Sequence, residues 1–144
     1  MSLHGTYDAN NLFAKILRGE IPAVKIYEDA DVVAFMDIFP QARGHFLVVP
    51  KNVTARNFLE LPAERVGPLM GAVHKLAIAA EKALKPDGVV ITQFNGAPAG
   101  QTIFHLHFHV IPRWEGVSLA GHAHDKRADI PELERIAKQI AAAL

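Results

Sequence analysis

The sequence predicts an α+β fold, with a five-stranded antiparallel sheet, one long helix and several short helices. Three observations support this prediction. Five short apolar runs are typical of strands and are mostly joined by short turns, one long amphipathic helix interrupts them, and a second amphipathic helix closes the chain. Strands joined by short turns pair antiparallel, whereas a parallel sheet needs a long crossover between strands. With 144 residues, we expect a single domain over residues 1–144.

A short helix and three strands are predicted in the first fifty residues. Asn10 or Asn11 can cap the helix, because an amide side chain accepts hydrogen bonds from the N–H groups of a first helical turn. Gly19 ends this helix. Short apolar runs bounded by turn residues or proline predict the strands, which cover residues 24–28, 32–36 and 45–49.

The longest helix is predicted from Pro62 or Ala63 to Leu84, where apolar residues recur at helical spacing. Two strands then follow with a Gly-, Ala- and Pro-rich loop between them. After an irregular segment, Asp129 can cap a last helix. These elements are the strands 89–94 and 105–111, the loop 95–100, the irregular segment 116–127 and the final helix 131–143.

The composition argues against several classes of protein. The 15 basic and 15 acidic residues cancel, so the basic excess that is typical of nucleic-acid binding is absent. The absence of cysteine excludes disulfides and thiolate metal sites, and it is compatible with a reducing compartment. No apolar run reaches the ~20 residues of a membrane span, and no signal segment is visible. We therefore expect a cytoplasmic protein with no membrane or nucleic-acid partner.

Three histidines, His105, His107 and His109, alternate with the apolar residues Leu106 and Phe108. Successive side chains of a strand point to opposite faces, so the apolar residues would enter a core while the imidazoles share the other face. A purely structural role for such a cluster is unfavourable, because every buried ring needs hydrogen-bond partners. Neutral imidazole is a nucleophile near pH 7, and its N–H group can donate a hydrogen bond. The pattern therefore predicts a catalytic site.

A metal site is the alternative function for these histidines. On a regular strand His105 and His109 lie roughly 13 Å apart at Cα, whereas zinc needs its nitrogen ligands at about 2.0–2.1 Å. All three cannot easily converge on one ion, but two of them could do so with a third ligand such as His45. We predict no bound metal and no cofactor. The remaining histidines are expected to be surface residues, and these are His4, His74, His122 and His124.

Residues 100–111 read Gly-Gln-Thr-Ile-Phe-His-Leu-His-Phe-His-Val-Ile and resemble the motif of the histidine triad superfamily. The resemblance implies a family core over about residues 10–112 and a variable C-terminal extension over 113–144 that contains the final helix. It also implies a homodimer in which the long helices and edge strands pair across a twofold axis. Further segments resemble the bacterial type of the nucleotide-binding branch, and these are residues 13–16, 21–22, 35–38 and 40–51.

The resemblance implies a nucleotidyl hydrolase or transferase that acts at the α-phosphorus of purine nucleoside phosphoramidates or related adenylates. His107 would attack the phosphorus and form a nucleotidyl-histidine intermediate, which water resolves. His109 would donate to phosphate oxygens or to the leaving group, while His105 and His45 would orient His107. Two alternatives stay open, namely a dinucleoside polyphosphate hydrolase that uses the same residues and a non-catalytic nucleotide-binding regulatory protein.

The resemblance also implies which residues bind an AMP-like nucleotide. Asp37 would accept hydrogen bonds from the ribose hydroxyls, although a turn residue after a strand explains it equally well. Thr102 and backbone N–H groups near Gly100 and Gln101 would hold phosphate oxygens, in a loop that could otherwise be an ordinary hairpin. Asn95 would bind ribose or phosphate, or form a turn with the next glycine. The base would occupy an apolar slot, whose residues could also be plain core, made of Leu12, Phe13, Ile16, Ile21 and Phe35, with the Ile38 backbone beside the ribose.

The chain departs from the family pattern in two places. Many bacterial relatives carry a Cys-x-x-Cys zinc pair in the first helix, where this chain has Asn11 and Ala14, so we expect no structural zinc. The region that begins at Trp114 does not match the eukaryotic tail that contributes to substrate choice. The resemblance therefore does not imply a leaving group, although Arg113 and Trp114 could replace that tail.

Overall fold

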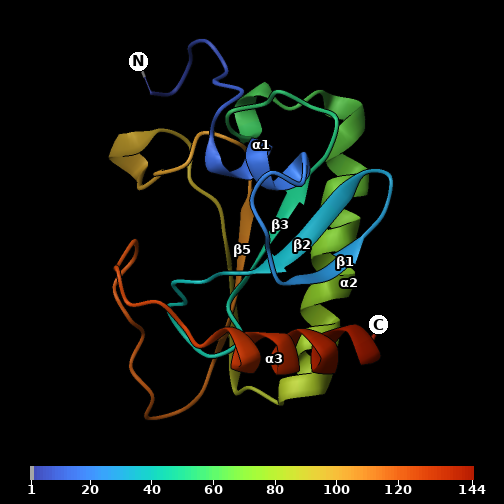
Figure 1. The fold of residues 1–144 in the computed structure, drawn as a ribbon, viewed down its shortest axis with the longest axis vertical. Helices are drawn as coiled ribbons and strands as arrows, with labels where there is room; N and C mark the ends of the chain where they lie inside the picture. Colours follow the sequence, from blue (N-terminus) through green and yellow to red (C-terminus); the bar gives the residue numbers. More distant parts are fainter. Residues whose placement is uncertain (1) are drawn as a thin grey trace.

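A five-stranded antiparallel sheet lies at the centre of the protein, in a computed structural model that describes residues 2–144. The strands follow the spatial order β1-β2-β3-β5-β4, and every neighbouring pair is antiparallel. The predicted fold class is confirmed (Figure 1). The strands are β1 (Lys25–Glu28), β2 (Val32–Met36), β3 (Phe46–Pro50), β4 (Gly88–Thr92) and β5 (Phe108–Arg113).

Helices cover both faces of this sheet (Figure 1). Side chains alternate along β2, so that Val32 and Ala34 enter a large core with α2 and α3, whereas Val33 and Phe35 enter a smaller core with α1. This period of two is what a strand buried on both faces produces. The helices are α1 (Leu12–Leu17), α2 (Val66–Leu84) and α3 (Ile130–Ala142), and the 3-10 turns are Phe58–Glu60, Ala63–Arg65 and Ala97–Ala99.

The predicted helix caps of α1 and α3 are present. The Asn11 side chain accepts a hydrogen bond from the N–H of Ala14, and Asp129 caps the start of α3. The start of the long helix differs from the prediction, because Ala63–Arg65 is a 3-10 turn. Pro68 explains the difference, since a proline has no N–H to donate and is tolerated only in the first turn of an α-helix. Among residues 2–144, no helix combines the length and the apolar character that a membrane span requires.

The strand predicted over residues 105–111 was wrong at its first residues. β5 begins at Phe108, and the N–H of Leu106 donates instead to the carbonyl oxygen of Ala55 at 3.0 Å. This bond draws the backbone before His107 out of the sheet. β5 also continues through Pro112, which pairs with Val89 on the edge strand.

Residues 114–128, which we call the C-terminal strap, connect β5 to α3 along the side of the sheet where the chain leaves β2 (Figure 1). The strap is irregular over most of its length, as predicted. Ala120 and Gln41 exchange two hydrogen bonds of 2.8 and 3.0 Å, and the N–H of Ala128 donates to the carbonyl oxygen of Ile38 at 2.8 Å. The strap is therefore attached to the segment between β2 and β3.

Gly44, in the segment between β2 and β3, has a φ of +85°, and a Cβ there would lie 2.5 Å from Leu84 Cδ1 and 3.2 Å from Pro112 Cγ. We expect Gly44→Ala to lower the free energy of unfolding by about 1 kcal/mol for the left-handed backbone and by about 1 kcal/mol or more for overpacking. Gly19→Ala is the matched control, because Gly19 has a φ of +77° and no atom within 4 Å of its Cβ position. Urea unfolding measures both losses, and equal losses would contradict the packing argument.

Candidate active site

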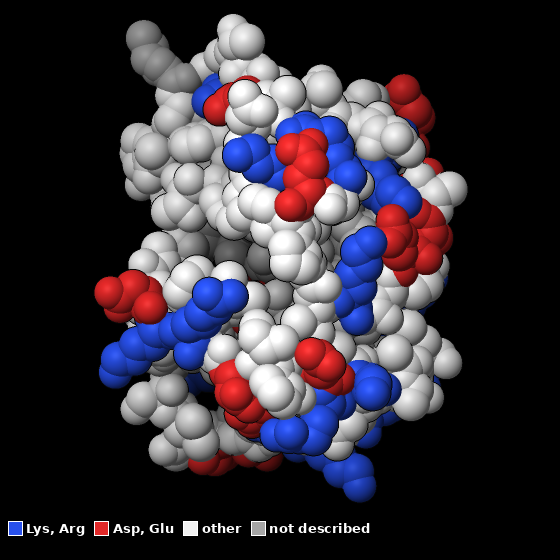
Figure 2. Space-filling view, in the orientation of Figure 1, with Lys and Arg blue, Asp and Glu red and all other residues white. Residues whose placement is uncertain are grey.

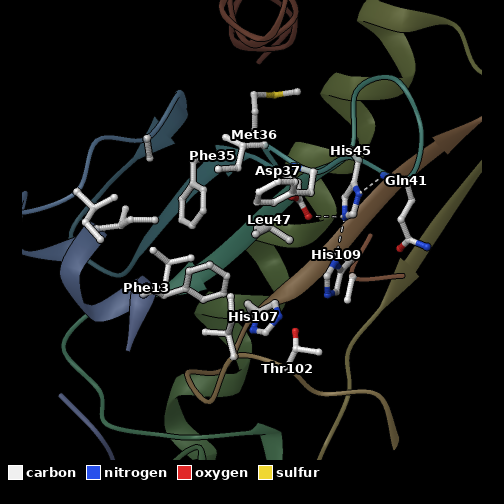
Figure 3. Close-up of a pocket in the computed structure, with 18 of the residues that line it drawn as sticks. Phe13, Phe35, Met36, Asp37, Gln41, His45, Leu47, Thr102, His107 and His109 are labelled. Atoms are coloured by element: carbon white, nitrogen blue, oxygen red, sulfur yellow. Dashed lines mark hydrogen bonds and ion pairs between the residues drawn. The ribbon is translucent and has the colours of Figure 1, made fainter. Parts of the chain in front are cut away.

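A pocket of about 310 Å³ opens beside α1, between the end of β2, the start of β5 and the strap. Figure 2 shows the hollow on the face that carries α1. The pocket contains three predicted catalytic residues from two separate parts of the chain, which are His45 and the pair His107 and His109 (Figure 3). The predicted binding residues that also line it are Leu12, Phe13, Ile16, Ile21, Phe35, Asp37, Ile38 and Thr102.

His107 lies at the floor of the pocket, and one of its ring nitrogens is engaged in a hydrogen bond. Its Nδ1 lies 2.7 Å from the carbonyl oxygen of His105, which can only accept, so Nδ1 carries the proton. The lone pair is then on Nε2. Burial is the main cause that lowers the pKa of His107 to about 4, and the ring is neutral near pH 7. This is the form in which imidazole acts as a nucleophile.

A chain of hydrogen bonds fixes the proton positions of His45 and His109. The N–H of Gln41 donates to Nδ1 of His45 at 3.0 Å, which places the proton of neutral His45 on Nε2. This Nε2–H donates to Nδ1 of His109 at 3.0 Å, and neutral His109 therefore carries its proton on Nε2 (Figure 3). Within residues 2–144, Nε2 of His109 is buried and has no hydrogen-bond partner. A buried N–H group beside a nucleophile can serve an incoming oxygen or nitrogen atom.

Both rings of this pair are held neutral. Burial, with the nearby His107 and His45 as smaller causes, lowers the pKa of His109 to about 2. Burial also lowers the pKa of His45 to about 4, against the opposing attraction of Asp37. Because both rings stay neutral near pH 7, the hydrogen-bond directions described above persist there.

Asp37 is a turn residue, as one of the two explanations from the sequence has it, and it also lies at the pocket. One carboxylate oxygen accepts a hydrogen bond of 2.8 Å from the N–H of Phe39, as in a turn, and the other lies 3.5 Å from Nε2 of His45. The side chain also lines the pocket. Its acceptor oxygens are therefore held at the wall between the apolar end and the histidines (Figure 3).

The apolar end of the pocket is formed by side chains that also belong to the smaller core. Phe13 packs edge-on against both Phe35 and His107, with ring centroids 5.5 and 4.8 Å apart. The two explanations for these residues, a base slot and plain core, are thus compatible. The sequence did not single out Leu47 and Ile103, which line the same end.

Three predicted binding residues lie behind the pocket wall and do not line the pocket. The Asn95 side-chain oxygen accepts from the N–H of Phe58 at 3.0 Å, which occupies the group expected to bind ribose or phosphate. Gln101 donates to the carbonyl oxygen of Arg56 at 2.6 Å and accepts from the N–H of Gly96 at 2.8 Å. Gly100 is the third. The side chains of Asn95 and Gln101 thus hold the loop in shape.

His105 also lies behind the pocket. Its Nε2–H donates to the carbonyl oxygen of Pro50 at 3.0 Å, and its Nδ1 accepts from the hydroxyl group of Tyr7 at 2.5 Å. Burial lowers its pKa, so this arrangement persists at neutral pH. His105 therefore acts on His107 through its backbone carbonyl group. Tyr7 was missed, because no local motif connects it to a residue 98 positions away.

The strap brings two further histidines to the pocket, a position that the sequence did not predict for these expected surface residues. His122 is exposed, yet it lines the pocket and donates from Nε2 to the carbonyl oxygen of Gly100 at 2.7 Å. His124 donates from Nε2 to the carbonyl oxygen of Pro40 at 2.8 Å and accepts from the N–H of Lys126 at 3.0 Å. His74, in contrast, is exposed on α2 as predicted.

Among residues 2–144, one group of side chains could hold a metal ion. One ligand atom each of Asp37, His45 and His109 lies within 4.8 Å of the others. This set differs from the sequence alternative in which two triad histidines chelate together. His45 and His109 also form the hydrogen bond described above, which occupies Nε2 of His45 and Nδ1 of His109 when the rings are neutral.

The buried neutral histidines predict a loss of stability in acid. Histidine in an unfolded chain titrates near 6.5, whereas the folded pKa is about 4 for His45 and His107 and about 2 for His109. As the pH falls below 6.5 the unfolded chain binds more protons, so the free energy of unfolding decreases by up to about 1.4 kcal/mol per pH unit for each histidine. Urea unfolding at pH 7.5 and 5.0 measures this. His109→Gln should weaken the dependence, and a stability unchanged between the two pH values would contradict the explanation.

Comparisons with known proteins agree with this geometry. A family model described as the HIT domain matches residues 18–116. A Hit-like protein from Bartonella henselae, described as involved in cell-cycle regulation, has 49% identity and a TM-score of 0.90, covering 97% of this chain and 100% of that chain. A zinc-bound histidine triad family protein from Mycobacterium smegmatis has 36% identity and a TM-score of 0.79, covering 93% and 92%. The adenosine 5'-monophosphoramidase of Saccharomyces cerevisiae is 35% identical over 147 residues, covering 100% of this chain and 89% of that protein. The chain belongs to the HIT domain family.

Proposed function

We propose that this protein is a nucleotide hydrolase that acts at the α-phosphorus of purine nucleoside phosphoramidates through a nucleotidyl-His107 intermediate. The observation that carries the proposal is the pairing of a neutral His107, whose Nε2 lone pair is available, with the unpartnered Nε2–H donor of His109 in one pocket. The relatives named adenosine 5'-monophosphoramidase, from two yeasts, support this choice of substrate class.

The first chemical step forms a bond from Nε2 of His107 to the α-phosphorus and breaks the bond from phosphorus to the departing nitrogen. The nitrogen of the substrate enters this step protonated, so the leaving group departs as a neutral amine, and the Nε2–H of His109 donates a hydrogen bond to a phosphate oxygen. The nucleotidyl-imidazole is cationic, and its Nδ1–H donates to the carbonyl oxygen of His105. A hydrogen bond with a charged donor is stronger than a neutral one, and the 2.7 Å contact is already in place for it.

The second step uses water as the nucleophile. Water attacks the phosphorus, one of its protons passes to solvent, and the bond between phosphorus and His107 breaks. AMP leaves, and His107 returns to its starting tautomer. In this complex the base occupies the apolar end near Phe13, the ribose lies at Asp37, and Thr102 contacts the phosphate.

His107→Ala should abolish the covalent intermediate and lower hydrolysis of adenosine 5'-phosphoramidate by about 10³-fold or more, because the nucleophile is removed. Intact-protein mass spectrometry after rapid quenching measures the adduct, and His74→Ala on the exposed side of α2 is the control. Wild type and control should each gain the mass of one adenylate. Turnover without an adduct, retained in His107→Ala, would contradict the covalent mechanism.

A comparison of turnover between the two substrate classes separates the proposal from its alternatives. Preferred turnover of diadenosine polyphosphates over phosphoramidates would favour the dinucleoside polyphosphate hydrolase. Tight binding of AMP with no turnover of either substrate class would favour a regulatory binding protein.

We also propose that the protein forms a homodimer through β4. The edge strand β4 exposes Val89, Val90 and Ile91, with 36%, 36% and 47% of their surfaces accessible. Since adjacent residues of a strand point to opposite faces, apolar side chains are exposed on both faces of β4. A long apolar edge of this kind normally pairs with another chain or is covered. Ile78 on α2 is also exposed.

Ile91→Lys should convert the dimer to a monomer, because it places a charge in the proposed apolar interface. Light scattering coupled to size-exclusion chromatography measures the mass. Leu59→Lys is the matched control, since Leu59 is 61% exposed but lies in the turn Phe58–Glu60, away from β4. A wild type that is monomeric at micromolar concentration would contradict the proposal.

A further inference from the structure

We infer that Tyr7 is a positioning residue for the nucleophile His107, and that it acts through His105. Tyr7 belongs to the N-terminal segment, residues 2–8, which lies before α1 and ahead of the residues that the HIT domain model matches. The inference rests on the proposed hydrolase function, in which His107 attacks the substrate. It depends on how His105 is held, on how the N-terminal segment is attached, and on the position of Tyr7 outside the pocket.

The peptide group between His105 and Leu106 carries the carbonyl oxygen that accepts from Nδ1–H of His107. A peptide group is planar, so the direction of this carbonyl is fixed once the residues at both of its ends are fixed. Leu106 is held by the hydrogen bond of 3.0 Å from its N–H to the carbonyl oxygen of Ala55. His105 is held through its ring.

The ring of His105 is fully buried and has a hydrogen bond on each nitrogen. Its Nε2–H donates to the carbonyl oxygen of Pro50 at 3.0 Å, and a ring held at one nitrogen can still turn about that bond. The Tyr7 hydroxyl group donates to Nδ1 at 2.5 Å, and the two rings pack edge-on with their centroids 5.7 Å apart. The second hydrogen bond therefore removes the rotation that the first one allows.

The N-terminal segment is attached on both sides of Tyr7. Before it, the carbonyl oxygen of Leu3 accepts a hydrogen bond of 2.6 Å from the side-chain amide of Asn57, which is fully buried. After it, the carbonyl oxygen of Asp8 accepts a hydrogen bond of 2.8 Å from the side-chain amide of Asn11, the residue that caps α1. The hydroxyl group is thus presented by a backbone that is held at two points.

Tyr7 contacts the support of the nucleophile from outside the nucleotide pocket, because it is not among the residues that line the pocket. Loss of its hydroxyl group should therefore slow the chemical step and leave nucleotide affinity intact. A tyrosine that served stability alone would lower the free energy of unfolding and leave the rate per folded molecule unchanged. The two roles are thus separable by measurement.

The test compares wild type with Tyr7→Phe, because phenylalanine keeps a ring against His105 and removes only the hydroxyl group. Tyr27→Phe is the matched control. Tyr27 lies on β1 outside the pocket, and its hydroxyl group donates to a carboxylate oxygen of Asp29 at 2.6 Å. Two quantities are measured for each protein, namely the single-turnover rate of adduct formation with adenosine 5'-phosphoramidate and the Kd of AMP.

We expect Tyr7→Phe to lower the rate of adduct formation by about 10- to 100-fold, the range for loss of a partner that orients a reacting group. The Kd of AMP should change by less than about twofold, because no contact with the nucleotide is removed. Tyr27→Phe should match wild type in both quantities. An unchanged rate in Tyr7→Phe, an equal loss in Tyr27→Phe, or a loss of affinity as large as the loss of rate would overturn the assignment.

The tautomer of His107 gives a second readout, which does not depend on turnover. Nitrogen NMR spectra of histidine-labelled protein distinguish protonated from unprotonated ring nitrogens, and the signals of His107 are assigned by their loss in His107→Ala. Wild type should show the Nδ1–H form alone. In Tyr7→Phe both signals should move toward averaged positions, because the accepting carbonyl group is held less firmly and the Nε2–H form becomes populated.

The two readouts separate failure of this inference from failure of the proposed function. If wild type forms no adduct and turns over no adenylate, the proposed function fails, and the spectra still test Tyr7. Identical His107 signals in wild type and Tyr7→Phe would then overturn the positioning role, whereas averaged signals in Tyr7→Phe alone would support it.

Discussion

The hydrogen bond from Nδ1–H of His107 to the carbonyl oxygen of His105 is the contact on which the rest of the site depends. It forms only because the backbone leaves the sheet before β5, where the N–H of Leu106 turns to Ala55. In a regular strand that carbonyl group would belong to the ladder of the sheet. His105 in turn is held on both ring nitrogens, by Tyr7 and by the backbone of Pro50. One departure from regular structure therefore determines which nitrogen of His107 is reactive.

Burial keeps the histidines of the site neutral, and hydrogen bonds with backbone groups fix which ring nitrogen carries the proton. Burial lowers the pKa of His45, His107 and His109, so that the charged forms are excluded at neutral pH. Backbone groups then fix the tautomers of the rings. The N–H of Gln41 fixes the tautomer of His45, and the hydrogen bond from His45 fixes that of His109. The result is a neutral imidazole with an available lone pair beside a buried N–H donor in the same pocket.

Much of the fold could be predicted from sequence because it depends on local patterns. The alternation along β2 and the caps Asn11 and Asp129 are readable within a few residues. The triad was visible for the same reason. What could not be predicted depends on distant partners: Tyr7 at His105, Ala55 at Leu106, and the return of His122 to Gly100. An irregular strap carries no periodicity, so nothing in its sequence indicates that it lies against the pocket.

The two ends of the pocket are built in physically different ways, and this affects how each can change during evolution. Phe13 and Phe35 fill a core as well as lining the pocket, so a substitution there alters packing and stability together. Near Gln41 and Ile38 the strap is attached through the backbone groups of Ala120 and Ala128, which any residue other than proline supplies equally well. Its exposed side chains are thus free to vary while the backbone stays attached. Under the proposed function, a fold of this kind can retain its nucleoside end and diversify in what it removes from the phosphorus.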